Sequence, residues 1–258
     1  MTSAQLMQTR RGRSDRRRAA LAMMVVAIAT LCGCDSLLKG PAAPELSTPY
    51  AGGQVWAVAP LANESGVSDI DTARVADLLA QEVQQVRGVD VIPVNRVILA
   101  MRQMDMPAVA SPADAMSLMN VLNVDGVIVG TITAWDPYKP PVLGAAVELH
   151  LRERLSSSSI NAQQLTKAVS GEPAPGELGP VNPVAQAAGV FDARHKPVQE
   201  QLERFSRTRV EKDAAFGQDI YLVRMELYTQ FVSYQLIASL MESERRRLGL
   251  VVQALSER

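Results

Sequence analysis

Hydrophobic and polar positions alternate with two different periods along this chain, and each period predicts a different kind of element. Four runs are dense in β-branched and other apolar residues and are expected to form strands, at residues 54–59, 89–93, 124–134 and 143–155. In the last run, apolar side chains occupy every second position, which is typical of a strand with one face toward solvent. His150 lies on the solvent-facing side of that pattern.

Three stretches between these runs carry apolar residues at helical spacing. The first is expected to begin at a capping box formed by Ser68 and Asp71 and to end at Gly88, while Asn95 and Ser111 are expected to cap the second and third. The resulting order is β-α-β-α-α-β-β. It predicts an α/β fold with a mixed sheet of about four to five strands and packed helices, followed by a C-terminal helical extension.

The second half of the chain changes character. Residues 156–194 are rich in Pro, Gly and Ser and are expected to be a disordered loop, with a weak candidate strand at 165–169. Residues 195–255 are expected to be helical, with one helix over 197–210 and a long one over 219–248. Nearly half the circumference of the long helix is apolar and needs cover. We favour docking onto the chain's own sheet; a seam with another copy or a partner is the alternative.

Charge is distributed unevenly over the 258 residues, which have a net charge of −1. Residues 1–33 hold six arginines and one acid, Asp15, which gives them +5 and leaves −6 for the remainder. A mildly acidic body argues against nucleic acid as a partner, because nucleic-acid binding needs a basic face. The chain has two cysteines, Cys32 and Cys34, so the residues after them can build neither a disulfide framework nor a thiolate metal site.

The N-terminal residues have the features of a secretion signal. A basic leader precedes the apolar run Ala19–Leu31, whose 13 residues would reach about 20 Å as a helix, too short to cross a bilayer. The run ends in Leu31-Cys32-Gly33-Cys34, which resembles the bacterial lipobox. That resemblance implies cleavage between Gly33 and Cys34, palmitate-type acylation of Cys34, and loss of Cys32 with signal peptide 1–33. An ordinary signal peptide with a chance cysteine is the alternative. We expect export by the general secretion route.

The residues after the cleavage site are expected to form a tether. Residues 34–53 would comprise the lipidated N-terminus and a flexible segment rich in Pro, Gly and small residues, reaching at most about 60 Å when extended. Asp35 follows the cysteine and resembles the inner-membrane retention signal of enterobacteria, so it is a sorting candidate. Because that rule is specific to one lineage, inner and outer membrane both remain open.

Three phrases in residues 54–155 carry a family resemblance: Val55–Asn63, Val91–Arg96 and Leu122–Gly130. They resemble the α/β domain shared by the curli-secretion (CsgG-like) lipoproteins, the N-terminal domain of the TolB type, and the LpoB-like lipoprotein activators of peptidoglycan synthases. The resemblance implies a shared fold and a role in the cell envelope. The D-x-x-T-G turn usual in these families after the fourth strand is missing here.

Motifs for chemistry are scarce. Gly126 and Gly130 lack the spacing of a phosphate-binding loop, and close strand packing explains them better. His150 and His195 are the two histidines, and we expect His150 to be solvated rather than catalytic or metal-binding. Residues 245–247, all arginine, form either a solvated face, which we favour, or a contact with anionic headgroups. We assign no catalytic, cofactor-binding or metal-ligating residue and expect no cofactor.

These features predict a non-enzymatic, lipid-anchored protein of the cell envelope that faces the periplasm or the exterior. It would act as a scaffold, adaptor or regulator of an envelope assembly through its α/β domain. Its expected partners are membrane lipid, through acylated Cys34, and an envelope protein or further copies of itself. Two alternatives stay open: a subunit of a curli-type secretion channel or oligomeric ring, and a ligand-binding protein or enzyme of unrecognised type.

Overall fold

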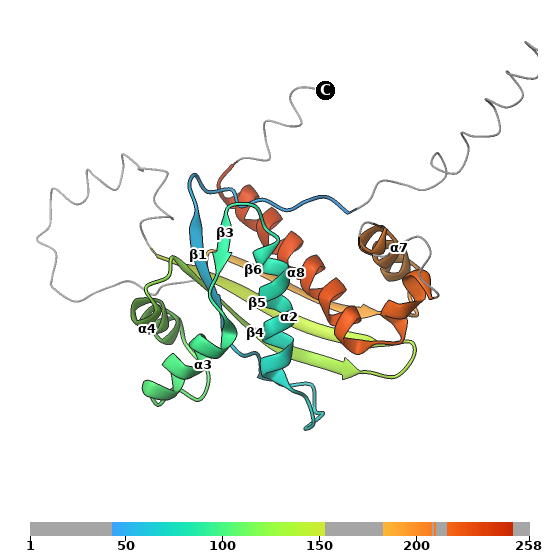
Figure 1. The fold of residues 1–258 in the computed structure, drawn as a ribbon, viewed down its shortest axis with the longest axis horizontal. Helices are drawn as coiled ribbons and strands as arrows, with labels where there is room; N and C mark the ends of the chain where they lie inside the picture. Colours follow the sequence, from blue (N-terminus) through green and yellow to red (C-terminus); the bar gives the residue numbers. More distant parts are fainter. Residues whose placement is uncertain (1–42, 153–182, 208, 210–215, 250–258) are drawn as a thin grey trace, which may run out of the picture. The chain divides into compact units, whose positions relative to one another are not determined.

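The computed structural model describes residues 43–152, 183–207, 209 and 216–249 (Figure 1). A six-stranded sheet has the order β3-β1-β4-β5-β6, with the short β2 beside β4. Its strands are β1 (Gln54–Val58), β2 (Ala62–Asn63), β3 (Val89–Val91), β4 (Gly126–Asp136), β5 (Val142–Leu151) and β6 (Ala185–Asp192). β1 runs parallel to β3 and β4, whereas β4, β5 and β6 are antiparallel. The predicted mixed α/β fold is confirmed.

The sheet is larger than predicted because of two strands that the hydrophobic pattern does not reveal. β2 has two residues, and β6 lies inside the stretch 156–194 that was predicted to be a disordered loop. That prediction is wrong for residues 185–192, whose sequence AQAAGVFD consists mainly of small residues with weak strand preference. β6 forms a strand because it pairs with β5, where Ala185 lies opposite Leu149, and not because its own residues favour one. The candidate strand at 165–169 lies outside the described residues.

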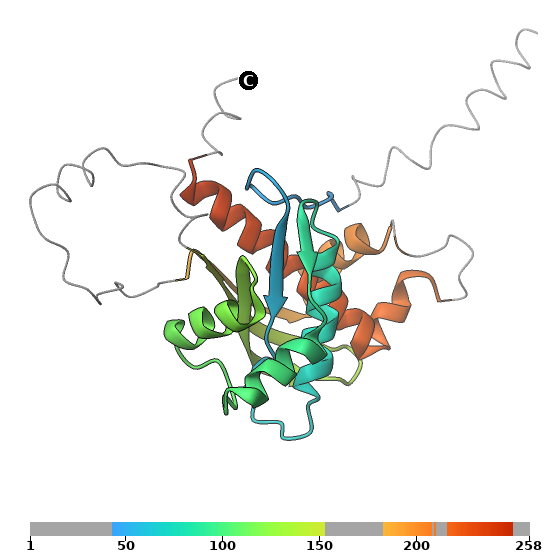
Figure 2. The same ribbon diagram turned by 60° about the vertical axis from the view of Figure 1, so that its left-hand side comes forward.

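Helices cover the two faces of the sheet unequally (Figures 1 and 2). They are α2 (Thr72–Gln84), α3 (Val94–Gln103), α4 (Pro112–Leu122), α7 (Lys196–Ser206), the short 3-10 helix η1 (Gly217–Leu222) and α8 (Met225–Arg247). One core lies between the sheet and α2 and α8, and it contains inward residues of all the long strands. A smaller core lies beneath α3 and α4 and contains no residue of β5 or β6.

The helix starts differ in how well the sequence predicts them. Ser111 and Asp114 form the capping box at α4, as the motif indicates. The capping box predicted at Ser68 is wrong, since α2 begins after Asp71, whose side chain accepts a hydrogen bond from Arg74 N at 2.9 Å. Asn95 is not a cap either, because α3 begins one residue earlier, after Pro93.

The C-terminal helix belongs to the main core. The predicted helix 219–248 is broken at Val223 and Arg224 into η1 and α8. α8 is buried along the sheet through Phe231, Ile237 and Leu240. This confirms the prediction that the helix docks onto the chain's own sheet, rather than the alternative of a seam with another molecule. It therefore completes the α/β layer rather than extending from it. Among the described helices, none is both long and apolar enough to cross a membrane.

The two glycines of β4 are places of close packing, as the sequence suggests. A Cβ at Gly126 would lie 2.6 Å from the Leu151 side chain, and one at Gly130 would lie 2.8 Å from the carbonyl oxygen of Ala146. Any larger residue would force β4 away from β5. The steric requirement explains both glycines without a bound phosphate.

Candidate functional site

The described chain begins with an extended segment, residues 43–53, which we call the N-terminal arm. It lies along the folded body, where Ser47 pairs with Arg87 in a parallel bridge. Thr48 N donates to Arg87 O at 3.0 Å, and Arg87 N donates to Leu46 O at 2.9 Å. The tether predicted for residues 34–53 is therefore shortened, because its residues from 43 onward are bound to the domain.

Side chains at the end of α8 hold this arm through a polar cluster, the arm clamp, formed by Tyr50, Ser47, Glu244, Arg245 and Arg247. The Tyr50 hydroxyl donates to Glu244, and Arg247 Nε donates to Glu244 Oε2 at 2.7 Å. Glu244 is fully buried, so these bonds compensate for its lost hydration. Burial raises the pKa of Tyr50, which keeps its hydroxyl protonated and able to donate.

The prediction that the arginines at the end of α8 form a solvated face is only partly correct. Arg245 donates from Nη2 to Ser47 O at 2.8 Å and Ser47 Oγ at 3.0 Å, so it binds the arm. Arg247 belongs to the same clamp through Glu244. Arg246 is exposed and pairs with Glu242 at 3.7 Å. Two of the three arginines thus have a structural role that charge patterning alone does not indicate.

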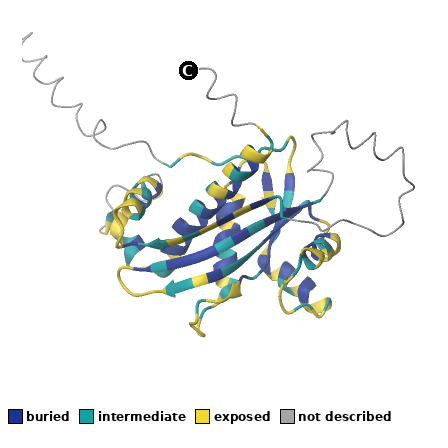
Figure 3. Cartoon of the chain, turned by 180° about the vertical axis from the view of Figure 1, so that it is seen from behind, coloured by how far each residue is buried: buried dark blue, intermediate teal, exposed yellow. Residues whose placement is uncertain are grey.

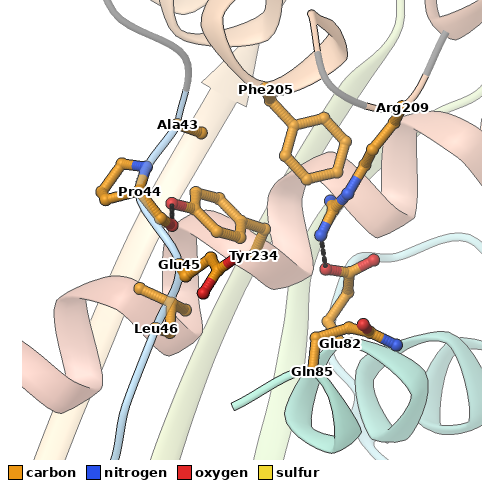
Figure 4. A pocket seen from close by; sticks show the side chains of 9 residues that line it. All are labelled: Ala43, Pro44, Glu45, Leu46, Glu82, Gln85, Phe205, Arg209 and Tyr234. Atoms are coloured by element: carbon orange, nitrogen blue, oxygen red, sulfur yellow. Dashed lines mark hydrogen bonds and ion pairs between the residues drawn. The ribbon is translucent and has the colours of Figure 1, made fainter. Parts of the chain in front are cut away.

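A cavity of about 300 Å³ lies where the arm meets α2, α7 and α8 (Figure 4). Its lining residues are Ala43, Pro44, Glu45, Leu46, Glu82, Gln85, Phe205, Arg209 and Tyr234. Arg209 Nη2 bonds Glu82 Oε2 at 2.9 Å, and its guanidinium carbon lies 3.9 Å from the Phe205 ring centroid. The Tyr234 hydroxyl donates to Pro44 O at 2.7 Å.

The groups in this cavity are engaged with one another. Burial raises the pKa of Glu82, while Arg209 opposes that shift through its charge and hydrogen bond. Arg209 is held between the carboxylate and the aromatic ring, a cation–π arrangement that also tethers the chain after α7. The lining residues include no serine, cysteine or histidine that could act as nucleophile or base. The cavity therefore serves as a joint between the arm and three helices.

His150 lies in a different environment from the one expected. It is 2% exposed, so the predicted solvated histidine is wrong. α4 packs against this end of β5, where Arg152 Nη2 donates to Met119 O at 2.8 Å. His150 Nε2 lies 3.4 Å from Glu148 Oε2, and its Nδ1 has no partner within the described part of the chain. Burial lowers the pKa of His150, while Glu148 opposes that shift.

This burial predicts a pH-dependent stability. In the unfolded chain His150 takes up a proton near its ordinary pKa of about 6.5, whereas the folded chain resists protonation. Stability present above pH 6.5 is therefore lost as the pH falls below it. We expect the urea midpoint to fall between pH 7.5 and pH 5.5, and His150→Asn to reduce that fall. The exposed His195 is the matched control; His195→Asn should leave the fall unchanged. An equal fall in both variants would contradict this assignment.

Across the described residues, no cluster of three or more His, Cys, Asp or Glu side chains could hold a metal ion. Gly33, Cys34 and Asp35, the residues predicted for cleavage, lipidation and sorting, lie outside the described residues.

Among the described residues, no helix covers the second face of β5 and β6 beyond the end where α4 packs (Figure 3). The alternation in residues 143–155 predicts the solvent-facing side of β5, whereas nothing in the sequence predicts that of β6. We call this second face the outer sheet face and define it by the outward side chains Thr133, Ala146, Gln186, Ala188 and Val190. Val190 is 63% exposed, and the core under α3 and α4 does not extend beneath this face. Across it, Gln186 Nε2 donates to Glu148 Oε1 at 3.0 Å. The face is flat, and its outward side chains are mostly small and uncharged.

The fold and these surfaces define an α/β sheet domain with a bound N-terminal arm and one open sheet face. No family model matches the chain, and no curated protein matches it. Solved structures similar to it include the dodecamer of a PelC variant from Paraburkholderia phytofirmans, with 20% identity over 42% of this chain and 67% of that chain, at a TM-score of 0.27.

Two further similar structures are the C-terminal domain of LpoB from Salmonella enterica and the lipoprotein GNA1162 from Neisseria meningitidis. The first has 12% identity over 41% of this chain and 76% of that chain, with a TM-score of 0.34. The second has 20% identity over 45% of this chain and 93% of that chain, with a TM-score of 0.30. At these identities and scores, the similarity carries no information about function. The curli-secretion and TolB-type resemblances stay predictions.

Proposed function

We propose that this protein is a non-enzymatic, lipid-anchored component of the cell envelope that acts as a scaffold, adaptor or regulator of an envelope assembly. Cleavage between Gly33 and Cys34 and acylation of Cys34 would anchor it, with Asp35 as the sorting determinant. The clamped arm supports this role, because it holds residues of the predicted tether against the folded body. In the cavity between the arm and α2, α7 and α8, the polar groups are engaged with one another, which also favours a non-catalytic role.

The single observation that carries the proposal is the outer sheet face. Exposed β-sheet surface of small, uncharged residues is unusual on a monomer and suits burial against another protein. Glu148 and Gln186 supply polar groups that can fix the orientation of a partner. We propose that the partner is a protein of the envelope that presents an apolar surface.

The test uses two valines of similar exposure on different elements of the domain. Val190 on the outer sheet face is 63% exposed, and Val121 on α4 is 55% exposed. A photo-crosslinking residue at position 190 of the full-length protein in its native membrane should give a discrete product, at least fivefold above that from position 121. The partner identified should then be lost from pull-downs of Val190→Arg but not of Val121→Arg. Equal crosslinking from both positions would contradict the proposal.

The mass of the crosslinked product also addresses the oligomeric alternative. A product of twice the chain mass would indicate pairing of copies through this face, as in a ring. A larger product of mixed composition would indicate a different protein. A secretion channel has no specific support here, because the long described strands belong to one sheet whose other face is covered by α2 and α8.

A further inference from the structure

The arm fixes the point at which the membrane anchor must join the folded body. Ala43 N donates to Arg204 O at 3.1 Å in the last turn of α7, and Tyr234 holds Pro44 O. From Cys34 to Ala43 the chain spans nine residue steps, which reach at most about 30 Å when extended. A body of this size is about 40 Å across. The linker is thus shorter than the body that it holds.

The length of the linker determines which side of the domain faces the membrane. α7 and η1 lie on the same side as the arm's first residue (Figures 1 and 2). They are joined there by the rings of Phe205 and Tyr221, whose centroids are 5.7 Å apart. α3 and α4 lie on the far face of the sheet from α8. A 30 Å linker allows the first side to reach the lipid surface, and when that side faces the lipid, α3 lies on the side turned away.

The side chains on the near side suit a membrane interface. Phe216 is 68% exposed and Val223 is 59% exposed, one on each side of η1. Arg224, which follows Val223, is exposed, and so is Arg204 on α7. Large apolar side chains accompanied by arginine are the combination that partitions into the headgroup region of a bilayer. We call these four residues the α7–η1 surface.

We propose that the α7–η1 surface rests on the phospholipid bilayer that holds acylated Cys34. This inference relies on the proposed anchoring. Acidic groups on the same elements, Glu200, Glu203 and Asp219, balance the arginines. The contact is therefore carried by apolar insertion and linker length rather than by attraction to anionic lipid. The arm clamp acts as the positioning element that keeps the linker short.

The experiment uses the full-length lipidated protein in vesicles of phosphatidylcholine that contain a lipid with a nitroxide on its headgroup. An environment-sensitive fluorophore is attached to Phe216→Cys or, as control, to Leu99→Cys on α3, where Leu99 is 56% exposed. Quenching at position 216 should be at least threefold stronger than at position 99. Replacing one third of the lipid by phosphatidylglycerol should change it less than twofold.

A second variant tests the linker itself. Twenty Gly and Ser residues inserted between Ala42 and Ala43 should lower quenching at position 216 to that at position 99. Equal quenching at the two positions before insertion, or no effect of the insertion, would overturn the inference. Intact mass of each sample reports acylation separately. A mass that shows no acylation would refute the proposed anchoring. An acylated protein with equal quenching at positions 216 and 99 would refute only the proposed orientation on the membrane.

Discussion

Replacement of Cys34 by alanine is expected to abolish fatty-acid incorporation, whereas replacement of Cys32 leaves it unchanged. Both thiols lie at the end of the same apolar run, two positions apart. The lipobox resemblance gives them different fates, because Cys34 becomes the acylated N-terminus and Cys32 leaves with the leader. Each buried lipid methylene contributes about 0.8 kcal/mol, so two or three chains hold the protein firmly on a membrane.

The measurement is incorporation of an alkyne-labelled palmitate during growth, followed by intact mass. Wild type and Cys32→Ala should carry the label at equal levels, with a mass that begins at Cys34. Cys34→Ala should lose the label completely. Retention of the label in Cys34→Ala, or its loss in Cys32→Ala, would refute the assignment and with it the proposed anchor.

Replacement of Phe231 by alanine is expected to lower the free energy of unfolding by about 3–5 kcal/mol. Phe231 is fully buried in the first half of α8, and its ring lies 5.6 Å from both Phe205 and Tyr228 and 6.0 Å from Phe191, measured between centroids. These contacts join α8 to α7 and β6. Removing the ring leaves a cavity that three elements share, and edge-on aromatic contacts are lost as well.

Urea unfolding of the detergent-solubilised protein, followed by circular dichroism, measures this change. Leu99→Ala is the control, since Leu99 is exposed on a helix and its removal should change the free energy by no more than about 0.5 kcal/mol. A loss below 1 kcal/mol for Phe231→Ala would mean that α8 is not part of the cooperative unit.

Those parts of the fold with strong local signals could be predicted from the sequence. The β-branched run at 124–134 becomes β4, and Ser111 with Asp114 begins α4 as the capping motif indicates. In both places, local preference and burial agree. The docking of α8 also follows from its wide apolar face, which a single sheet can cover.

What the sequence does not reveal depends on contacts between distant residues. β6 consists of small residues and is ordered by its pairing with β5. His150 occupies a polar position in an alternating strand, yet it is buried in the fold. The arm has the composition of a linker, and its binding depends on Glu244 and Arg245, about two hundred residues later. The outer sheet face is predicted in part by the alternation along β5, whereas its part on β6 is not, because the small residues of β6 give no clear period.

The arm clamp has a consequence for the biogenesis of the protein. Tyr50 and Glu244 are separated by 194 positions, and Ser47 and Arg245 by 198. Contacts over such separations form late, because the ends of a long loop must first meet. The clamp cannot close until α8 has been synthesised, so the arm stays unbound while most of the chain is made. In the export and acylation that we propose, the arm would remain free of the body until α8 has crossed the membrane.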